Sequence, residues 1–524
     1  MAKKTANKAK LVIAGPGAGK THNMVSEIIQ NLPLLTPCRY MAVITHTNAA
    51  TNNIRERLGK RIAVPPNLFI GTIHAFLNKF IIIPYSSFGD GEIPEEKLFV
   101  QFGIDEAVKG AQKKSGTKVV DHKDKAKLRA NIANALKKKG YITFDQTLSL
   151  SRDTVNNGHI AAQVSNRLQF LFIDEYQDTG NEVNSIIEVL RKLGKTKIYC
   201  VGDPEQYIQS FDSSIQMFAN IPILKAARSN AFEVTLNKNN FRCSQSIINF
   251  LNYFNGRMFN NIKFEQHHQK KSETKEATPT IDLEVCYIPG SDSNVSPIIE
   301  VFYKLCDSYN IGMVNRCLLA KQEHDVKRII AAVNRKYMNP KKNGNLSPIS
   351  VIRDTVLVML GLNSEQFYSR HNKNAHDLRK LAVELFHAIR LGQIKDENDF
   401  GIYLRDHYNL IVKNAMLVKV EDLKFTVSED NGIGVVTVAN IHTIKGLEHE
   451  AVLAITKNEQ ELLNWIETDR IKRDADEDDV CRIGYVAFSR AERLLCISCL
   501  STISKETEIL LSDMNVKICR PITV

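Results

Sequence analysis

The sequence contains no uninterrupted apolar run of about 18–20 residues, the length that a membrane-spanning helix needs. Its first ten residues, MAKKTANKAK, carry charge without an apolar core, so we do not expect a secretory signal peptide. Ten cysteines are present, but only Cys496 and Cys499 form a CxxC pair, without a second pair or nearby histidines. This pattern disfavours a zinc or iron–sulfur site and favours a buried strand. Free thiols without an export signal predict a reducing, cytoplasmic location and no membrane partner.

The composition indicates a folded protein that binds a polyanion. The chain has 524 residues, of which 43% are hydrophobic, enough for about two to four domains with sizeable cores. The formal net charge is +11. A basic balance of this size favours a polyanion partner, usually nucleic acid, over a soluble protein that is merely basic.

Five apolar runs end in polar loops: KLVIAGPGAGKT, YMAVITHTN, LQFLFIDEYQD, KIYCVGDPEQ and VVTVANIHTIKGLE. Runs of this kind are typical of parallel strands that are covered on both faces. Helical patterns alternate with them, for example over 20–32, 49–62 and 244–254. We therefore predict an α/β fold with open parallel sheets, whose ligands bind at the carboxyl ends of the strands.

Two regions interrupt the alternation. Residues 76–140 are mostly helical in pattern, and 109–139 contain eleven Lys or Arg against two Asp. Residues 330–425 lack strand signals and also read as helices. Each region is expected to form an inserted subdomain. The basic run is either an additional phosphate contact or a solvated helical face, and the polar segment 265–278 is expected to be a loop or linker.

The first of these polar loops, AGPGAGKT, fits a phosphate-binding P-loop at every position except its first, which is alanine. Glycines let backbone N–H groups turn toward phosphates, Lys20 reaches the β- and γ-phosphates, and Thr21 ligates Mg²⁺. The preceding strand and following helix are the context that this motif requires. The expected nucleotide-binding residues are Ala14, Gly15, Pro16, Gly17, Ala18, Gly19, Lys20 and Thr21.

Acidic and amide side chains follow two later strands. Asp174 and Glu175 end the run FLFIDE, which suits Asp174 as an Mg²⁺ ligand and Glu175 as the group that orients or deprotonates the attacking water. Gln206, in VGDPEQ, is placed to contact a γ-phosphate or that water. Together with a P-loop, these residues argue for hydrolysis of the nucleotide.

Two arginines complete the set. Arg242 lies in LNKNNFR and Arg490 in YVAFSRA, and either one alone would be read as a surface or ion-pair residue. A phosphoryl transition state needs added positive charge, which an arginine finger supplies at a gain of about 10³–10⁵ in rate.

The ordered motifs AGPGAGKT, THTNAA, GTIHAF, IDEYQD, VGDPEQYIQSF, LNKNNFR, NIHTIKGLE and YVAFSRA resemble the UvrD/Rep/PcrA branch of superfamily 1 helicases. The resemblance runs from residue 14 to 491, and the compact size resembles the helicase-like subunit of Gabija anti-phage systems. It implies two RecA-like domains with ATP between them. The implied limits are 1–75 and 141–235 for the first domain, 76–140 for a basic helical insertion, 236–329 and 426–524 for the second domain, and 330–425 for a reduced helical insertion.

The resemblance also assigns roles to individual positions. Lys20, Thr21, Asp174, Glu175, Gln206 and Arg242 match nucleotide positions, and Phe241 matches an aromatic residue that stacks on adenine. Glu448 and Arg490 face the nucleotide from the second domain. The positions that match contacts with single-stranded DNA are Thr47, Asn48, Thr72, His74, Phe211, His442 and Thr443.

Departures from the family pattern bear on function. Almost nothing precedes Leu11, so the glutamine motif that reads adenine is missing and base selectivity is open. His46 stands where an aromatic residue is usual. Gln209 and Asp212 replace an aromatic and an arginine that would handle bases, while Phe211 remains. Base–aromatic stacking is worth about 1–3 kcal/mol per base, so these changes predict a weaker grip on the strand.

We therefore expect a DNA-stimulated ATPase that uses ATP and Mg²⁺ to translocate on or unwind single-stranded or partly duplex DNA, 3′→5′ as the resemblance implies. The resemblance to Gabija adds a nuclease partner of the OLD/TOPRIM type and a role in anti-phage defence. The alternative is a nucleic-acid-sensing regulatory ATPase that switches a partner effector and unwinds little. A helicase–nuclease fusion is disfavoured, because only 34 residues follow Arg490.

Overall fold

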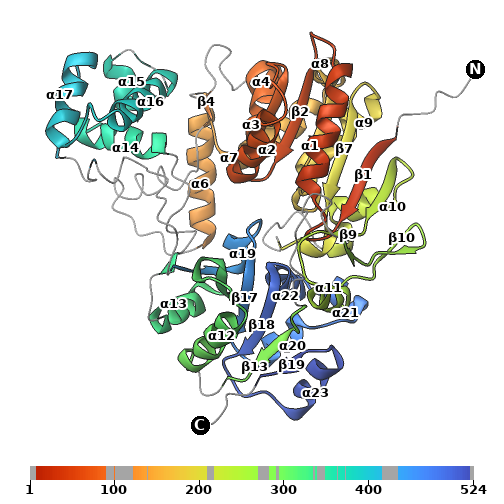
Figure 1. Ribbon diagram of the computed structural model, residues 1–524. Helices are drawn as coiled ribbons and strands as arrows, with labels where there is room; N and C mark the ends of the chain where they lie inside the picture. The colour runs from red at the N-terminus through yellow and green to blue at the C-terminus, as the bar shows by residue number, and fades with distance from the viewer. Residues whose placement is uncertain are drawn as a thin grey trace, which may run out of the picture.

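Two parallel sheets, each flanked by helices, form the body of the protein (Figure 1). The computed structural model describes residues 8–89, 99–100, 122–138, 140–208, 217–269, 282–290, 294–333, 337–338, 348–362, 364–371, 373, 375–415, 420 and 435–519. The α/β fold class, with two parallel-sheet domains and helical insertions, is confirmed. Within these ranges, no helix has the length and apolar character that would let it cross a membrane.

The first sheet has six parallel strands in the order β3-β2-β6-β7-β1-β8. Apolar residues alternate between its faces: Leu11 and Ile13 belong to one core cluster, Val12 and Ala14 to the other. Both faces are therefore covered, as the apolar runs predict. The strands are β1 (Ala9–Ala14), β2 (Tyr40–Thr45), β3 (Leu68–Thr72), β6 (Leu168–Ile173), β7 (Lys197–Gly202) and β8 (Phe232–Asn237). The helices of this part are α1 (Lys20–Asn31), α2 (Asn48–Gly59), α3 (Ile73–Leu77), α7 (Phe144–Asn156), α8 (Gly158–Arg167), α9 (Asn181–Leu193) and α10 (Pro222–Arg228).

The second sheet has seven parallel strands in the order β15-β16-β14-β17-β18-β13-β19. Cys496 and Cys499 are buried in β18, which confirms the buried strand expected for the CxxC pair. The strands are β13 (Cys286–Ile288), β14 (Arg316–Ala320), β15 (Tyr337–Met338), β16 (Val436–Asn440), β17 (His449–Thr456), β18 (Ala491–Cys499) and β19 (Lys517–Ile518). The helices are α11 (Gln245–Asn252), α12 (Ser296–Ser308), α13 (Glu323–Ala332), α19 (Ile441–Ile444), α20 (Glu459–Trp465), α21 (Arg470–Ala475), α22 (Val480–Phe488) and α23 (Lys505–Asp513).

Helices α14 (Pro348–Leu360), α15 (Ser364–His371), α16 (Ala375–Arg390) and α17 (Glu397–Tyr408) form a group of their own, at the upper left of Figure 1. They share a separate apolar core. The described part of the other insertion holds a π-helical turn (Asn78–Ile82), α4 (Ile83–Gly89), β4 (Phe99–Val100), α6 (His122–Lys137) and, just beyond it, β5 (Tyr141–Ile142). Residues 109–121 and 139 of the basic run lie outside the described residues.

The chain crosses between the two sheets after β8. Strands β9 (Asn239–Asn240) and β12 (His267–His268) form a short parallel pair, and β10 (Met258–Phe259) and β11 (Ile262–Lys263) form a hairpin. Phe259 and Phe264 pack in the core of the first sheet, whereas α11 packs in the core of the second. Within the predicted loop 265–278, residues 267–268 form strand β12, and residues 270–281 lie outside the described residues. The exact domain limits stay predictions.

Gly484 allows α22 to pack closely on α20, and α22 leads directly to Arg490. A Cβ atom at Gly484 would lie 2.6 Å from the Trp465 Cβ and 2.8 Å from its Cα. We expect Gly484→Ala to destabilise the protein by about 1–3 kcal/mol, since the backbone of Trp465 cannot move aside cheaply. Circular dichroism during urea unfolding measures the shift. Gly158→Ala is the control, because nothing lies within 4 Å of its added Cβ; equal shifts in both variants would contradict the packing argument.

Candidate active site

The phosphate-binding turn connects β1 to α1 at the carboxyl edge of the first sheet. Gly17 and Gly19 have φ values of 68° and 71°, a left-handed conformation that glycine adopts without steric cost. Gly19 is the N-cap of α1, and Lys20 is the first residue of that helix. The N–H groups at the N-terminus of α1 thus favour an anion at this position.

Asn237, at the end of β8, and Phe241, shortly after it, form hydrogen bonds to the backbone of this turn. The Phe241 N–H donates to the Gly17 carbonyl at 2.9 Å, and the Asn237 Nδ2 donates to the Ala18 carbonyl at 2.9 Å. Asn240 Oδ1 accepts from the N–H groups of Arg242 and Cys243. A Cβ on Gly17 would lie 2.2 Å from that oxygen, so only glycine fits there. The segment that carries Arg242 is therefore built against the P-loop.

Asp174 and Glu175 follow β6 and face Lys20. The Lys20 Nζ lies 3.7 Å from Glu175 Oε2, and Gln177 Nε2 donates to the same carboxylate oxygen at 2.7 Å. Glu175 has a φ of 49°, in the left-handed region that non-glycine residues seldom adopt and that is frequent at functional sites. Gln177 also accepts from the Asp203 N–H at 3.0 Å. Its amide thus links the two acidic loops.

The two carboxyl groups have opposite electrostatic surroundings. Burial, with the neighbouring Glu175 charge, raises the pKa of Asp174. Burial acts in the same direction on Glu175, but Lys20 and Lys445 outweigh it and lower the Glu175 pKa. A divalent cation near Asp174 would favour its ionised form. The donor set of Thr21 and Asp174 therefore fits Mg²⁺, which prefers one or two carboxylate ligands together with phosphate oxygens.

Lys445, in the loop after α19, reaches across to the first sheet. Its Nζ donates to both Asp178 oxygens, at 2.9 and 2.6 Å, and to the Gln206 carbonyl at 2.9 Å. The Gln206 side chain is buried and donates to Asp203 Oδ2 at 2.9 Å. Gln206 is thus held by contacts from both sheets.

Three charged residues from beyond the first sheet, Arg242, Glu448 and Arg490, lie near one another beside the P-loop. Arg242 forms an ion pair with Glu448. Arg490 is buried, and its guanidinium donates to the Val486 and Leu447 carbonyls and to Ser489 Oγ, all of them neutral oxygens. Burial and the nearby Arg242 charge lower the pKa of Arg490 to about 10. A polyphosphate would neutralise this group of cations, so the residues fit a nucleoside triphosphate.

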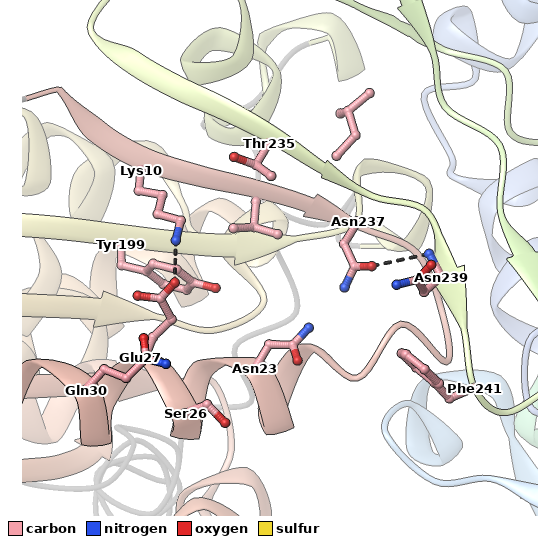
Figure 2. A pocket seen from close by; sticks show the side chains of 12 residues that line it. Lys10, Asn23, Ser26, Glu27, Gln30, Tyr199, Thr235, Asn237, Asn239 and Phe241 are labelled. Carbon is pink, nitrogen blue, oxygen red and sulfur yellow. Dashed lines mark hydrogen bonds and ion pairs between the residues drawn. The ribbon is translucent and has the colours of Figure 1, made fainter. Parts of the chain in front are cut away.

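A cavity of about 450 Å³ lies between α1 and β8, next to the P-loop (Figure 2). Phe241 closes one end of it, and an ion pair between Lys10 and Glu27 lies at the other. Asn23 rises from α1 toward Asn237 on β8 (Figure 2). An aromatic residue lies at each end, Phe241 at one and Tyr199 at the other, and amide side chains line the length between them, which suits a planar, hydrogen-bonding base.

The residues predicted to contact DNA follow strand ends on both sheets. Thr47 caps α2 and Thr72 caps α3, each hydroxyl accepting a backbone N–H. Asn48 is exposed, and the His74 ring packs edge-on against Phe144 at 4.6 Å between centroids. Phe211 lies outside the described residues, as do Gln209 and Asp212.

The remaining two predicted DNA contacts lie in α19 on the second sheet. His442 is exposed, and partial burial with the nearby Lys445 and Lys321 charges lowers its pKa. The Thr443 hydroxyl donates to Asn440 Oδ1 at 2.7 Å. His46 stands where the family usually has an aromatic residue. Burial lowers its pKa, the Lys445 charge acts in the same direction, and the Asp178 charge acts in the opposite one. These strand ends therefore carry polar and basic groups on both sheets.

Two contacts around this site were not predicted from the sequence. Gln266 reaches the P-loop from the segment expected to be a loop, and Glu205 binds three arginines that follow the first sheet in the chain. For Gln266, the sequence holds no periodic signal. For Glu205, the sequence signal is its position directly before Gln206 in VGDPEQ, at the end of an apolar run.

Glu205 is 3% exposed and accepts hydrogen bonds from Arg257, Arg470 and Arg473. The Arg470 contact is 2.6 Å long. Burial by itself raises the Glu205 pKa, but the three arginines outweigh it and lower the value to about 2. A buried carboxylate of the first sheet is therefore neutralised entirely by residues beyond that sheet.

We expect Glu205→Gln to destabilise the protein by about 3–5 kcal/mol, because the three arginines lose their counter-charge. The Glu205 pKa is lowered from about 4.3 in the unfolded chain, so its stabilisation is present above pH 4.3 and is lost as the pH falls toward 2. Urea unfolding of the parent chain and of Glu205→Gln between pH 7 and pH 3 measures the difference in their free energies of unfolding. Glu56→Gln, in an exposed pair with Lys60, is the control and should change little. If the difference in unfolding free energy between the parent chain and Glu205→Gln grew on acidification, the assignment would be contradicted.

Parts of the chain are similar to known proteins. The family model described as AAA domain matches residues 1–212. Gabija protein GajB of Bacillus cereus (strain VD045) is 27% identical over 274 residues, which are 52% of this chain and 52% of that protein. The chain thus aligns with about half the length of that relative.

Two helicases align over longer stretches. ATP-dependent DNA helicase Rep of Buchnera aphidicola subsp. Schizaphis graminum is 22% identical over 483 residues, 79% of this chain and 71% of Rep. A probable DNA helicase II homolog of Mycoplasma genitalium is 20% identical over an alignment of 602 positions, gaps included, which covers 95% of this chain and 83% of that protein. The resemblance seen in the motifs is confirmed: the chain is similar to the UvrD-like superfamily 1 helicases and to Gabija protein GajB.

Proposed function

We propose that the protein is an ATP hydrolase of the UvrD type, stimulated by single-stranded DNA, that couples hydrolysis to movement along DNA or to its unwinding. The observation that carries the proposal is the meeting of Lys20 and Glu175 from the first sheet with Arg242 and Arg490 beside one P-loop. Relatives whose printed names are DNA helicases support it.

The P-loop side of the site would bind and polarise the triphosphate. Lys20 would exchange its contact with Glu175 for phosphate oxygens, which frees the carboxylate to orient the attacking water. Thr21 and Asp174 would hold Mg²⁺, which neutralises phosphate charge when bound. The lowered pKa of Glu175 keeps this group ionised and able to accept a hydrogen bond from water at neutral pH.

The arginines would complete the site from the other side. Arg490 is buried among neutral oxygens and lies near Arg242, so it gains the most from an added anion. Arg242 is paired with Glu448 and would shift toward phosphate when the nucleotide binds. Charge developing on the phosphoryl group would then be met by cations from both sides of the P-loop.

The cavity beside Phe241 would take the base of the nucleotide. The Phe241 ring offers a stacking face close to Gly19, where an added Cβ would lie 3.8 Å from Phe241 Cδ2. Asn23 and Asn237 offer amides to the edge of the base (Figure 2). An amide presents a donor and an acceptor, which would supply contacts to the edge of the base.

The DNA strand would lie across the strand ends of both sheets. Thr47 and Thr72 keep their hydroxyl hydrogens for phosphate oxygens while their oxygens cap helices. His442 lies near Lys445, whose Nζ touches the loop of Gln206. A shift of this loop on hydrolysis would reach the DNA face through a single side chain. A 3′→5′ direction is the one the family resemblance implies.

The second candidate function is a regulatory ATPase subunit that senses nucleic acid and switches a partner effector. The specific observation in its favour is the pair Gln209 and Asp212, which replace an aromatic residue and a cation expected at the DNA strand. The likeness to Gabija protein GajB supports an anti-phage role. A nuclease of the OLD/TOPRIM type is the partner we propose, in the cytoplasm.

The ATP site is tested by two substitutions with different consequences. Lys20→Ala should abolish both ATP binding and hydrolysis, because it removes the phosphate charge partner. Glu175→Gln should abolish hydrolysis and keep ATP affinity within a few fold, since only the water-orienting carboxylate is lost. Steady-state phosphate release and calorimetric ATP titration measure the two properties. Turnover near that of the parent chain in either variant would refute the site.

A strand-displacement assay separates motor from switch. Duplexes of increasing length with a 3′ overhang should be unwound weakly and with poor processivity, because stacking and a cation are missing at Gln209 and Asp212. The combined change Gln209→Tyr and Asp212→Arg should tighten strand binding and lengthen unwinding, each stacked base adding about 1–3 kcal/mol. Duplexes with a 5′ overhang are the polarity control. Efficient unwinding of long duplexes by the unmodified chain would refute the regulatory alternative.

A further inference from the structure

Gln266 is buried where a polar loop was expected. It lies between β11 and β12, and its side chain is 1% exposed. The following strand, β12, pairs with β9, so the backbone of this segment is fixed beside the residues that precede Phe241 and Arg242. A glutamine buried this deeply needs partners for its amide, and those partners reveal what it does.

The Gln266 side chain lies against the P-loop backbone. Its Nε2 donates to the Pro16 carbonyl at 2.9 Å and to the Asn239 carbonyl at 3.2 Å. Only the nitrogen of the amide can face two carbonyl oxygens, so the orientation is determined. A Cβ on Gly15 would lie 2.5 Å from the Gln266 Cδ, which explains the glycine at this position. Gln266 Oε1 has no partner in the part of the chain that the structure describes.

The Gln266 backbone is clamped by the second sheet's domain. The Gln266 N–H donates to Asn252 Oδ1 at 2.9 Å, and Asn252 Nδ2 donates back to the Gln266 carbonyl at 2.9 Å. Asn252 ends α11, whose Ile248 and Leu251 are buried in the core of the second sheet. Asn252 and Gln266 therefore connect α11, which packs in that core, to the phosphate-binding turn.

We propose that Gln266 is a positioning residue for the P-loop: it holds the Gly15–Pro16 backbone in its phosphate-binding shape and ties that shape to the position of α11. This inference rests on the proposed ATPase function and deepens it. The grip on phosphate then depends on the second sheet through Gln266 as well as through the arginines. Within the described residues, the Gln266 side chain donates its hydrogen bonds to backbone carbonyls alone, so its effect reaches the nucleotide through the turn.

Gln266→Met tests the donated hydrogen bond while keeping the length and volume of the side chain. The change removes the hydrogen bonds to both Pro16 and Asn239. We expect the KM for ATP to rise about fivefold, the effect of losing the one bond that reaches the P-loop, with kcat changed less than about twofold. A purely structural role would lower the melting temperature without this split. An unchanged KM in a folded variant would overturn the proposal.

The contact with Gly15 allows a suppression experiment in full-length protein carrying Glu175→Gln, so that ATP is bound without turnover. Gly15→Ala should weaken calorimetric ATP binding about tenfold, because the new methyl group overlaps Gln266. In a Gln266→Ala background, the same change should cost less than about twofold. The control is Gly17→Ala, where a φ of 68° and the Asn240 side chain keep the strain. It should weaken binding equally in both backgrounds.

The outcomes are distinct. An equal cost of Gly15→Ala in both backgrounds would overturn the positioning role of Gln266 and leave the proposed ATPase untouched. If Gly15→Ala alone does not fold, recovery of folding by Gln266→Ala is the same suppression, and no recovery overturns the inference. Absence of ATP binding in the parent chain would overturn the proposed function and this inference with it.

Discussion

Two buried carboxylates of the first sheet, Asp178 and Glu205, depend on cations from beyond that sheet. Lys445 binds Asp178, and three arginines surround Glu205. A buried carboxylate without a partner is costly, so these contacts favour one arrangement of the two sheets. Asp178 closely follows Glu175, and Glu205 directly precedes Gln206. Any relative movement of the sheets must therefore act on the residues that would handle the phosphate and water.

The charges around the P-loop are unevenly compensated. Lys20 forms an ion pair with Glu175, and Arg242 forms one with Glu448. Arg490 is buried and hydrogen-bonds to neutral oxygens. A bound triphosphate would relieve this imbalance at several positions at once. Binding and approach of the two sheets would thus favour one another, which is the coupling that a DNA-driven ATPase requires.

Much of the fold could be predicted from local patterns. The apolar runs before Lys20, Asp174 and Gln206 specify strands buried on both faces, and their loaded ends identify one edge of a parallel sheet. Gln266 could not be predicted, because its partner Pro16 lies 250 residues away and EQHHQKK reads as a solvated loop. Arg473 and Glu205 are 268 residues apart, and an arginine in a charged helix has no local mark of burial. Such contacts depend on how the two sheets meet.

In the function that we propose, ATP hydrolysis depends on DNA that bridges strand ends of both sheets. The most direct measurement is the steady-state rate of phosphate release by the purified full-length chain during titration with single-stranded DNA, with Glu175→Gln as the blank. We predict a saturable increase in turnover whose midpoint moves to higher DNA concentration as salt is added, because phosphate contacts release counterions. A rate that is the same with and without DNA would contradict the central claim and would point to a protein partner as the regulator of the ATPase.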